Sequence, residues 1–199
     1  MKDNKNIEWL ANDWRIRCIS HIINLVVQAF LFADIIDLDE LESYDQANED
    51  EELIDEELWK ARFRLLGPLG KGHNIVVHIR KPGGHTEYFR KLAGRMILMD
   101  NRTRWNSWFN MLLVFLELKK QIDDYCEHFE SELKKDLLDL ADWKKLRTIK
   151  DFLQPFLQAT LSTKGDSVSI DRTLFTIDIL IKHLQETTVS PLPSLLILN

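Results

Sequence analysis

The sequence is poor in cysteine, with only Cys18 and Cys126 among its 199 residues. Small secreted domains need several cysteine pairs for a disulfide framework, and two cysteines do not supply one. Residues 2–6 are polar or charged, and no apolar stretch typical of a signal peptide follows them. We therefore expect an intracellular protein, nuclear or cytoplasmic, and not a secreted one.

Long hydrophobic runs are also missing. The longest one, residues 22–33, is interrupted by Asn24 and Gln28. It is shorter than the roughly 20 apolar residues that a helix needs to cross a bilayer. We therefore expect no membrane partner. Hydrophobic residues still make up 45% of the chain and charged ones 29%, which are values typical of a globular protein with a packed core.

Metal-binding motifs are incomplete in this sequence. It contains no CxxC pair, and Cys18-x-x-His21 offers only half of a zinc site by spacing. His73 and His78 are the nearest residues that could complete it. The competing interpretation is a buried cysteine beside a hydrogen-bonded histidine. We predict no metal site.

Phosphate-loop and hydrolase motifs are absent as well. Gly67-x-x-Gly70-Lys71-Gly72 has two residues where the phosphate loop needs four, and no Ser or Thr follows the lysine. We interpret this stretch as a turn that ends a helix. No spacing of Ser, His and Asp indicates a hydrolytic triad. A metal-dependent hydrolase with an unrecognised site remains a weaker alternative to the functions considered below.

The net charge of −6 hides two segments of opposite sign. Residues 34–57 contain 13 acidic side chains and no lysine or arginine, which is typical of a solvated linker or a frayed helix. Between Lys60 and Arg104 there are 11 lysines and arginines against only Glu87 and Asp100. This basic segment could neutralise the phosphates of a nucleic acid. The alternative is an ordinary surface that pairs with the acidic run.

Hydrophobic periodicity predicts a mainly α fold. Apolar residues recur at helical spacing over residues 16–32, 56–66, 100–129 and 170–184, and again from Trp143 to Leu153 ahead of a kink at Pro155. Residues 75–79 are too few to decide between strand and helix, and residues 133–140 suggest a short helix. For the first helix we expect a buried face made of Ile19, Ile22, Ile23, Val26 and Phe30.

The start of the helix near residue 100 carries an unusual group of residues. Asp100, Asn101 and Thr103 are all typical N-cap residues. Arg102, Arg104 and Trp105 lie beside them at the helix start. The apolar stripe that follows indicates a core helix, but two arginines and a tryptophan there can equally face a phosphate or a base.

Two motifs together resemble those of hAT-type DNA transposases, the hobo-Activator superfamily. The first is DN-x-TRWNS-W, from Asp100 to Trp108, and the second is R-C-x-x-H-x-x-N-L, from Arg17 to Leu25. Residues 67–77 and 151–171 are similar to the fungal branch. The matching motif residues are Cys18, His21, Asn24, Asp100, Thr103, Arg104, Trp105, Asn106 and Ser107.

The resemblance implies a domain organisation. Residues 1–33 would be the tail of a ribonuclease-H-like core carrying the CxxH motif, and 34–57 an acidic linker. Residues 58–184 would be the basic segment and the start of the helical insertion, followed by an unstructured tail at 185–199. By resemblance, the nucleic-acid-binding residues would be Arg17, His21, Arg102, Arg104 and Trp105.

The same resemblance implies no catalysis by this chain. The family uses three carboxylates that hold two divalent metal ions such as Mg²⁺. No residue here matches them, so we expect a truncated, non-catalytic protein without a cofactor and with DNA as its partner. The family's zinc finger and dimerisation segment are not matched either, which leaves self-association open. The alternative is a helical protein–protein interaction module that binds no nucleic acid.

Overall fold

The computed structural model describes residues 19–32, 56–99, 104–162 and 170–189. Helices account for most of these residues, and no strand occurs among them, which confirms the predicted mainly α fold. Most of the acidic run and residues 190–199 lie outside the described residues, so the predictions for a linker and for the end of the tail remain predictions.

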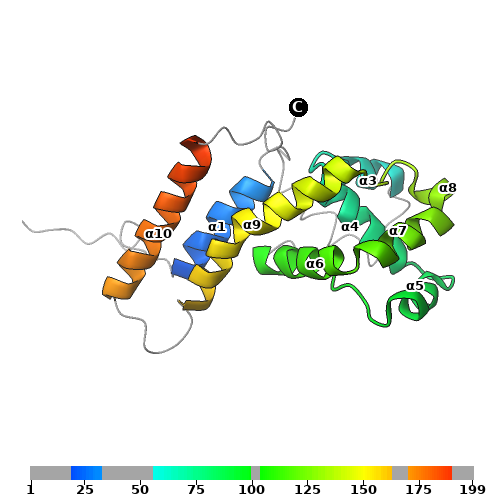
Figure 1. Ribbon diagram of the computed structural model, residues 1–199, viewed down its shortest axis with the longest axis horizontal. Helices are drawn as coiled ribbons and strands as arrows, with labels where there is room; N and C mark the ends of the chain where they lie inside the picture. The colour runs from blue at the N-terminus through cyan, green and yellow to red at the C-terminus, as the bar shows by residue number, and fades with distance from the viewer. Residues whose placement is uncertain (1–18, 33–55, 100–103, 163–169, 190–199) are drawn as a thin grey trace, which may run out of the picture.

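Figure 1 shows the helices in the order in which they follow one another along the chain. In order they are α1 (Ile19–Leu31), α3 (Glu56–Arg64), α4 (Pro68–Ile79), α5 (His85–Ala93), α6 (Trp105–Glu117), α7 (Lys119–His128), α8 (Glu130–Leu133), α9 (Leu140–Ser162) and α10 (Ile170–Val189).

Helix α9 runs through the middle of the molecule and connects its two ends (Figure 1). It packs against α1, α4, α6 and α10. Its predicted inner face, Trp143, Leu146, Ile149 and Leu153, is buried, as the periodicity indicates. Pro155 lies inside this helix, which continues to Ser162.

Helices α3 and α4 are joined by a tight turn in which Gly67 has a φ of 60°, and Pro68 then begins α4. The turn predicted for this glycine-rich stretch therefore ends at Gly67, because Gly70 and Gly72 belong to the helix. A Cβ atom at Gly70 would lie 1.6 Å from the backbone oxygen of Phe63, so the two helices meet there at backbone contact. The undecided residues 75–79 are the helical end of α4.

Three predictions about helix ends are corrected. Helix α3 begins at Glu56, as the sequence predicts, but it ends at Arg64 and not at Leu66. The helix expected over residues 133–140 does not form, since α8 ends at Leu133 and α9 begins at Leu140. Helix α10 continues to Val189, five residues into the expected unstructured tail.

The buried face predicted for α1 is partly wrong. Ile23 is buried, together with Val27 and Leu31, which follow it at four-residue intervals. Ile22 and Val26 are exposed, at 43% and 40%. The helix is apolar on more than one side, so periodicity could not identify the side that α9 covers. Ile19 and Phe30, also predicted, are partly buried against the core.

Candidate functional site

The two sequence motifs meet in one hollow of about 330 Å³ between α1, the start of α6 and α9. Its walls combine residues that are distant in sequence. From α1 come Ser20, His21 and Asn24, from the start of α6 come Arg104, Trp105 and Asn106, and from α9 comes Thr160. Ser20 and Thr160 were not among the predicted site residues, because neither residue type at these positions carries a chemical signal in the sequence.

A hydrogen bond ties the two motifs together. The backbone N–H of Trp105 donates to Oδ1 of Asn24 over 3.2 Å, across 81 residues of sequence. Arg104 is the N-cap residue of α6, with extended backbone angles of φ −137° and ψ 110°, and its own side chain gives no cap. Asn24 thus supplies from α1 an acceptor that a local N-cap side chain usually provides. The three predicted local caps, at positions 100, 101 and 103, lie outside the described residues.

The orientation of Asn24 is fixed by its amide group. Its Nδ2 donates to Oε1 of Gln28, one turn further along α1, over 3.1 Å. This leaves Oδ1 directed at α6, where it accepts from Trp105. The asparagine of the R-C-x-x-H-x-x-N-L motif therefore has a structural role. It follows His21 by three residues, so both residues lie on the same side of α1, within one turn.

The side chain of Trp105 belongs to the core. Only 1% of the residue is exposed, and its ring packs edge-on against Phe109 with 5.9 Å between the ring centroids. Of the two interpretations of Trp105, burial favours the core residue over a ring that stacks on a base. His21 and Arg104 are exposed at the same hollow. Arg17, Cys18 and Arg102 lie outside the described residues.

The polar groups at the start of α6 have different environments. Ser107 donates from Oγ to the backbone oxygen of Arg104 over 2.6 Å, which closes the first turn. The buried Oδ1 of Asn106 accepts no hydrogen bond from any of the described residues. The side chain of Arg104 is exposed, and it takes part in no ion pair with another of the described residues.

Most lysines and arginines of the basic segment, by contrast, form ion pairs with acidic residues of the same chain. Lys71 pairs with Asp142 over 2.8 Å, Arg95 with Glu117, and Lys91 with Glu87 over 2.8 Å. The acidic run contributes through its last two residues, described next. The basic segment is therefore largely neutralised by carboxylates from the same chain, which favours the ordinary-surface alternative for most of it.

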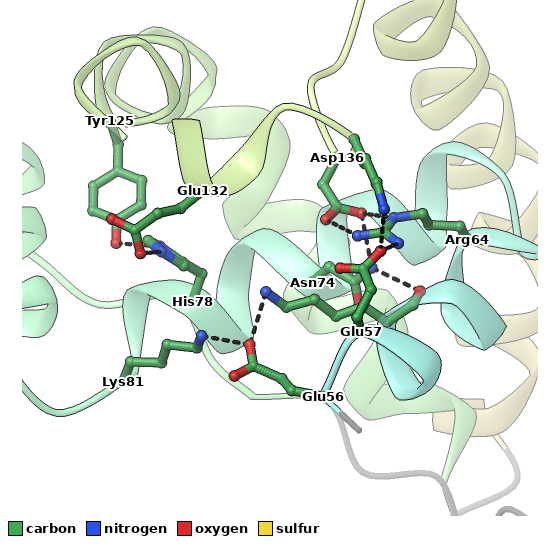
Figure 2. A network of polar contacts seen from close by, with 11 residues as sticks. Glu56, Glu57, Arg64, Asn74, His78, Lys81, Tyr125, Glu132 and Asp136 are labelled. Atoms are coloured by element: carbon green, nitrogen blue, oxygen red, sulfur yellow. Dashed lines mark hydrogen bonds and ion pairs between the residues drawn. The ribbon is translucent and has the colours of Figure 1, made fainter. Parts of the chain in front are cut away.

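A network around α3 shows how this neutralisation is built (Figure 2). Glu56 pairs with Lys60 over 2.9 Å and also with Lys81. Glu57 accepts from Arg64 and from Lys135, each over 2.7 Å. These pairings hold the end of the acidic run against the start of the basic segment.

The centre of the same network is Asp136, which the sequence did not single out. Its carboxylate accepts from Nε and Nη2 of Arg64, both over 2.8 Å, and from the amide of Asn74 over 2.8 Å. The Asp136 side chain has 0% exposure. A two-pronged pair of this kind is strong and geometrically specific. It ties the loop after α8 to both α3 and α4 (Figure 2).

These contacts shift the acidity of the groups involved. Hydrogen bonds from Lys60 and Lys81 lower the pKa of Glu56 to about 2. Hydrogen bonds from Lys135 and Arg64 lower the pKa of Glu57 to about 2. The pKa of Arg64 is raised above its ordinary value, first by its hydrogen bonds to Asp136. Both glutamates and the arginine are therefore charged at neutral pH.

We expect the folded state to lose stability as the pH falls from about 5 to about 2. The folded pKa of Glu56 and Glu57 is lowered from 4.5 to about 2, so their contribution is complete above the unfolded pKa and disappears through the folded one. Urea denaturation at pH 5, 3.5 and 2.5 measures this effect. The double variant Glu56→Gln, Glu57→Gln should show a shallower pH dependence. The prediction would be contradicted if the free energy of unfolding changed equally with pH in both proteins. The control is Glu127→Gln, which replaces an exposed glutamate on α7.

The histidines considered for zinc are separated in the structure. His21 lines the hollow, whereas His73 is buried and stacks on Phe63 with 3.9 Å between the ring centroids. His78 lies at the other end of α4, where it hydrogen-bonds Tyr125 and Glu132. His21, His73 and His78 therefore do not form one site. Cys18, the fourth residue considered, lies outside the described residues.

None of the helices described here combines the length and the apolar character that crossing a bilayer requires. This finding agrees with the short and interrupted hydrophobic runs of the sequence.

Comparison with known proteins identifies the helical scaffold. A protein of Talaromyces stipitatus described as "Putative transcriptional regulator tpeD" is 27% identical over 129 residues, which cover 62% of this chain and 15% of that protein. The chain thus spans only a small part of that relative's length. No solved structure matches this chain. The family model of the ZBED1 RNase-like helical domain matches residues 16–152, which include both motifs of the hollow and more than half of the sequence. The chain therefore belongs to the ZBED1 RNase-like helical domain family.

Proposed function

We propose that this chain is a hAT transposase-like protein that binds DNA without sequence preference and performs no catalysis of its own. The observation that carries the proposal is the meeting of the two motifs at one hollow, with His21 and Arg104 exposed at its rim. On this proposal α1 is the tail of a ribonuclease-H-like core, and the helices from α3 onward begin its helical insertion.

The chemistry of the hollow suits a phosphate group. A guanidinium forms charge-assisted hydrogen bonds with phosphate oxygens, and an imidazole can donate one more. Arg104 is also the N-cap residue of the 13-residue helix α6, whose positive dipole end favours an anion. These contacts go to the DNA backbone and carry no sequence information. Binding should therefore be non-specific and strongly dependent on salt.

Trp105 has a positioning role in this proposal. Its buried ring anchors the first turn of α6, and its backbone N–H is held by Asn24. The adjacent Arg104 is thereby presented at the surface in a fixed place. Because the remaining lysines and arginines are largely paired with acids, we assign the DNA contact to the hollow and not to the basic segment as a whole.

The relative described as a transcriptional regulator is consistent with a role at DNA, although this chain corresponds to only 15% of it. Nuclear localisation would follow from such a role. The absence of catalysis follows from the sequence expectation that no residue here matches the family's three metal-binding carboxylates. Nicking of a DNA duplex by stoichiometric protein with Mg²⁺ would contradict this part of the proposal and revive the metal-dependent hydrolase.

Replacing Arg104 with alanine should reduce the salt dependence of DNA binding. We expect the wild-type dissociation constant to lie in the non-specific range of ~10⁻⁴–10⁻⁶ M. Because Arg104 would neutralise one phosphate, the slope of log K against log salt should fall by about one in Arg104→Ala. Fluorescence anisotropy of a labelled duplex at several salt concentrations measures this slope.

The matched control is Arg90→Ala, an exposed arginine on α5, which lies at the opposite end of the molecule from α1 (Figure 1). This variant should keep the wild-type slope. Equal losses in both variants would show that the hollow is not the contact. An absence of binding at low salt would favour the other candidate function.

That other candidate is a helical protein–protein interaction module, favoured by apolar side chains exposed on two neighbouring helices. On α10, Phe175 is 66% exposed and Leu174 57%, and on α1, Ile22 is 43% exposed. Sedimentation velocity over a range of concentrations tests self-association through these exposed side chains. A shift to larger species that Phe175→Glu removes, without any DNA binding, would support the module.

A further inference from the structure

We propose that His78, His85 and Glu132 form a three-ligand site for one divalent transition-metal ion of the zinc class. The three residues come from the end of α4, the first residue of α5 and the short helix α8. The site lies outside the hollow assigned to DNA and does not depend on that assignment.

The geometry of the three side chains carries the inference. One potential ligand atom of each residue lies within 4.8 Å of the other two. A tetrahedral zinc ion with bonds of roughly 2.0–2.1 Å holds its ligand atoms about 3.4 Å apart, so donors that are farther apart than this must approach one another when the ion binds. The side chain of Glu132 is 51% exposed, which leaves it room to adjust.

The hydrogen-bond contacts of His78 with Glu132 and Tyr125 orient the histidine ring (Figure 2). Nε2 of His78 lies 3.0 Å from a carboxylate oxygen of Glu132, and Nδ1 of the same ring lies 2.9 Å from the hydroxyl of Tyr125. That hydroxyl is also 3.2 Å from Nδ1 of His85. A metal-bound histidine usually engages its second nitrogen in this way, which fixes the ring and leaves Nε2 of His78 directed at the carboxylate.

The donors are of the types that bind such an ion, two imidazoles and one carboxylate. The nearby positive charge of Lys81 is offset by its pairing with Glu56.

The donor set also defines the class of ion. Two imidazoles and one carboxylate are found as the protein ligands of zinc sites that keep a fourth position for water. Calcium and magnesium prefer all-oxygen ligands, and thiolate-seeking ions find no cysteine in this cluster. The half-exposed carboxylate of Glu132 gives the ion a route from solvent.

The test uses the full chain, freed of metal with a chelator and titrated with Co²⁺ as a spectroscopic probe and with Zn²⁺ in calorimetry. We expect one Co²⁺ per chain with visible absorption bands of a low-coordinate site, displacement by Zn²⁺, and a rise in Tm with zinc. The absence of stoichiometric binding would overturn the proposal.

Variants distinguish this site from other histidines. His85→Ala and Glu132→Gln replace side chains that are not fully buried, and each should weaken Co²⁺ binding by at least about 100-fold, more than the usual effect of an outer contact. His128→Ala is the control, because this exposed histidine stacks on Tyr88 outside the cluster. The proposed metal site would also be overturned by an unchanged affinity for Co²⁺ in His85→Ala and Glu132→Gln, or by an equal loss of affinity in His128→Ala. Circular dichroism of each variant verifies that the helices are retained.

Discussion

Replacing Asp136 with alanine is expected to lower the free energy of unfolding by about 3–5 kcal/mol, the usual cost of removing one partner from a buried ion pair. The carboxylate is fully buried and is the common acceptor for Arg64 and Asn74. Its removal leaves a guanidinium with 18% exposure without its principal partner. The loop after α8 would also lose its attachment to α3 and α4.

Urea denaturation followed by circular dichroism measures this change. Asp124→Ala is the matched control, since Asp124 is an exposed aspartate on α7, and a surface substitution of this kind usually changes stability by less than about 0.5 kcal/mol. A loss below about 1 kcal/mol in Asp136→Ala would mean that the network contributes little beyond a surface ion pair.

The second large effect is expected for Trp105→Ala, which should lower the free energy of unfolding by about 3–5 kcal/mol. The ring has 1% exposure and packs against Phe109, so its removal leaves a cavity at the first turn of α6. Phe175→Ala, which removes an aromatic ring that is 66% exposed, should have a much smaller effect.

Measuring DNA binding on the same variants separates the two roles of Trp105. If the ring only positions Arg104, the folded fraction of Trp105→Ala should bind with a weakened and less salt-dependent affinity. A variant that melts like the wild type, loses ~1–3 kcal/mol of affinity and keeps its salt slope would instead establish base stacking.

Long helices with a single apolar face were predictable from the sequence. The four predicted inner residues of α9 are all buried, because this helix offers one apolar stripe to its neighbours. The same method failed on α1, where apolar residues surround much of the helix. On α10, likewise, the apolar Leu174 and Ile181 are exposed, whereas Thr176 and Leu180 are buried. Periodicity identifies a helix more reliably than it identifies the neighbour that will cover it.

The hollow was predictable in part, through resemblance and not through periodicity. The resemblance assigned both His21 and Arg104 to nucleic-acid binding, and the structure places both at the same hollow. The role of Asn24 as the acceptor for the start of α6 had no local signal, since its partner lies 81 residues away.

The polar networks could not have been predicted from this sequence. Arg64 and Asp136 are 72 residues apart, and each is an ordinary charged residue in its own segment. His78, His85 and Glu132 match no recognised ligand spacing, and only the packing of α4, α5 and α8 brings them together. Contacts between distant residues of unremarkable type depend on the fold and leave no mark in the local sequence.

The contact between α3 and α4 at Gly70 restricts how this sequence can vary during evolution. Any side chain at position 70 would overlap the backbone oxygen of Phe63, and a backbone atom cannot be exchanged as a neighbouring side chain can. Apolar core positions, by contrast, tolerate swaps of similar volume. Homologues that keep this helix pair should therefore retain glycine at position 70 even where their hydrophobic residues have diverged. In an alignment, an invariant glycine one residue before the position of Lys71 would mark the shared α3–α4 packing.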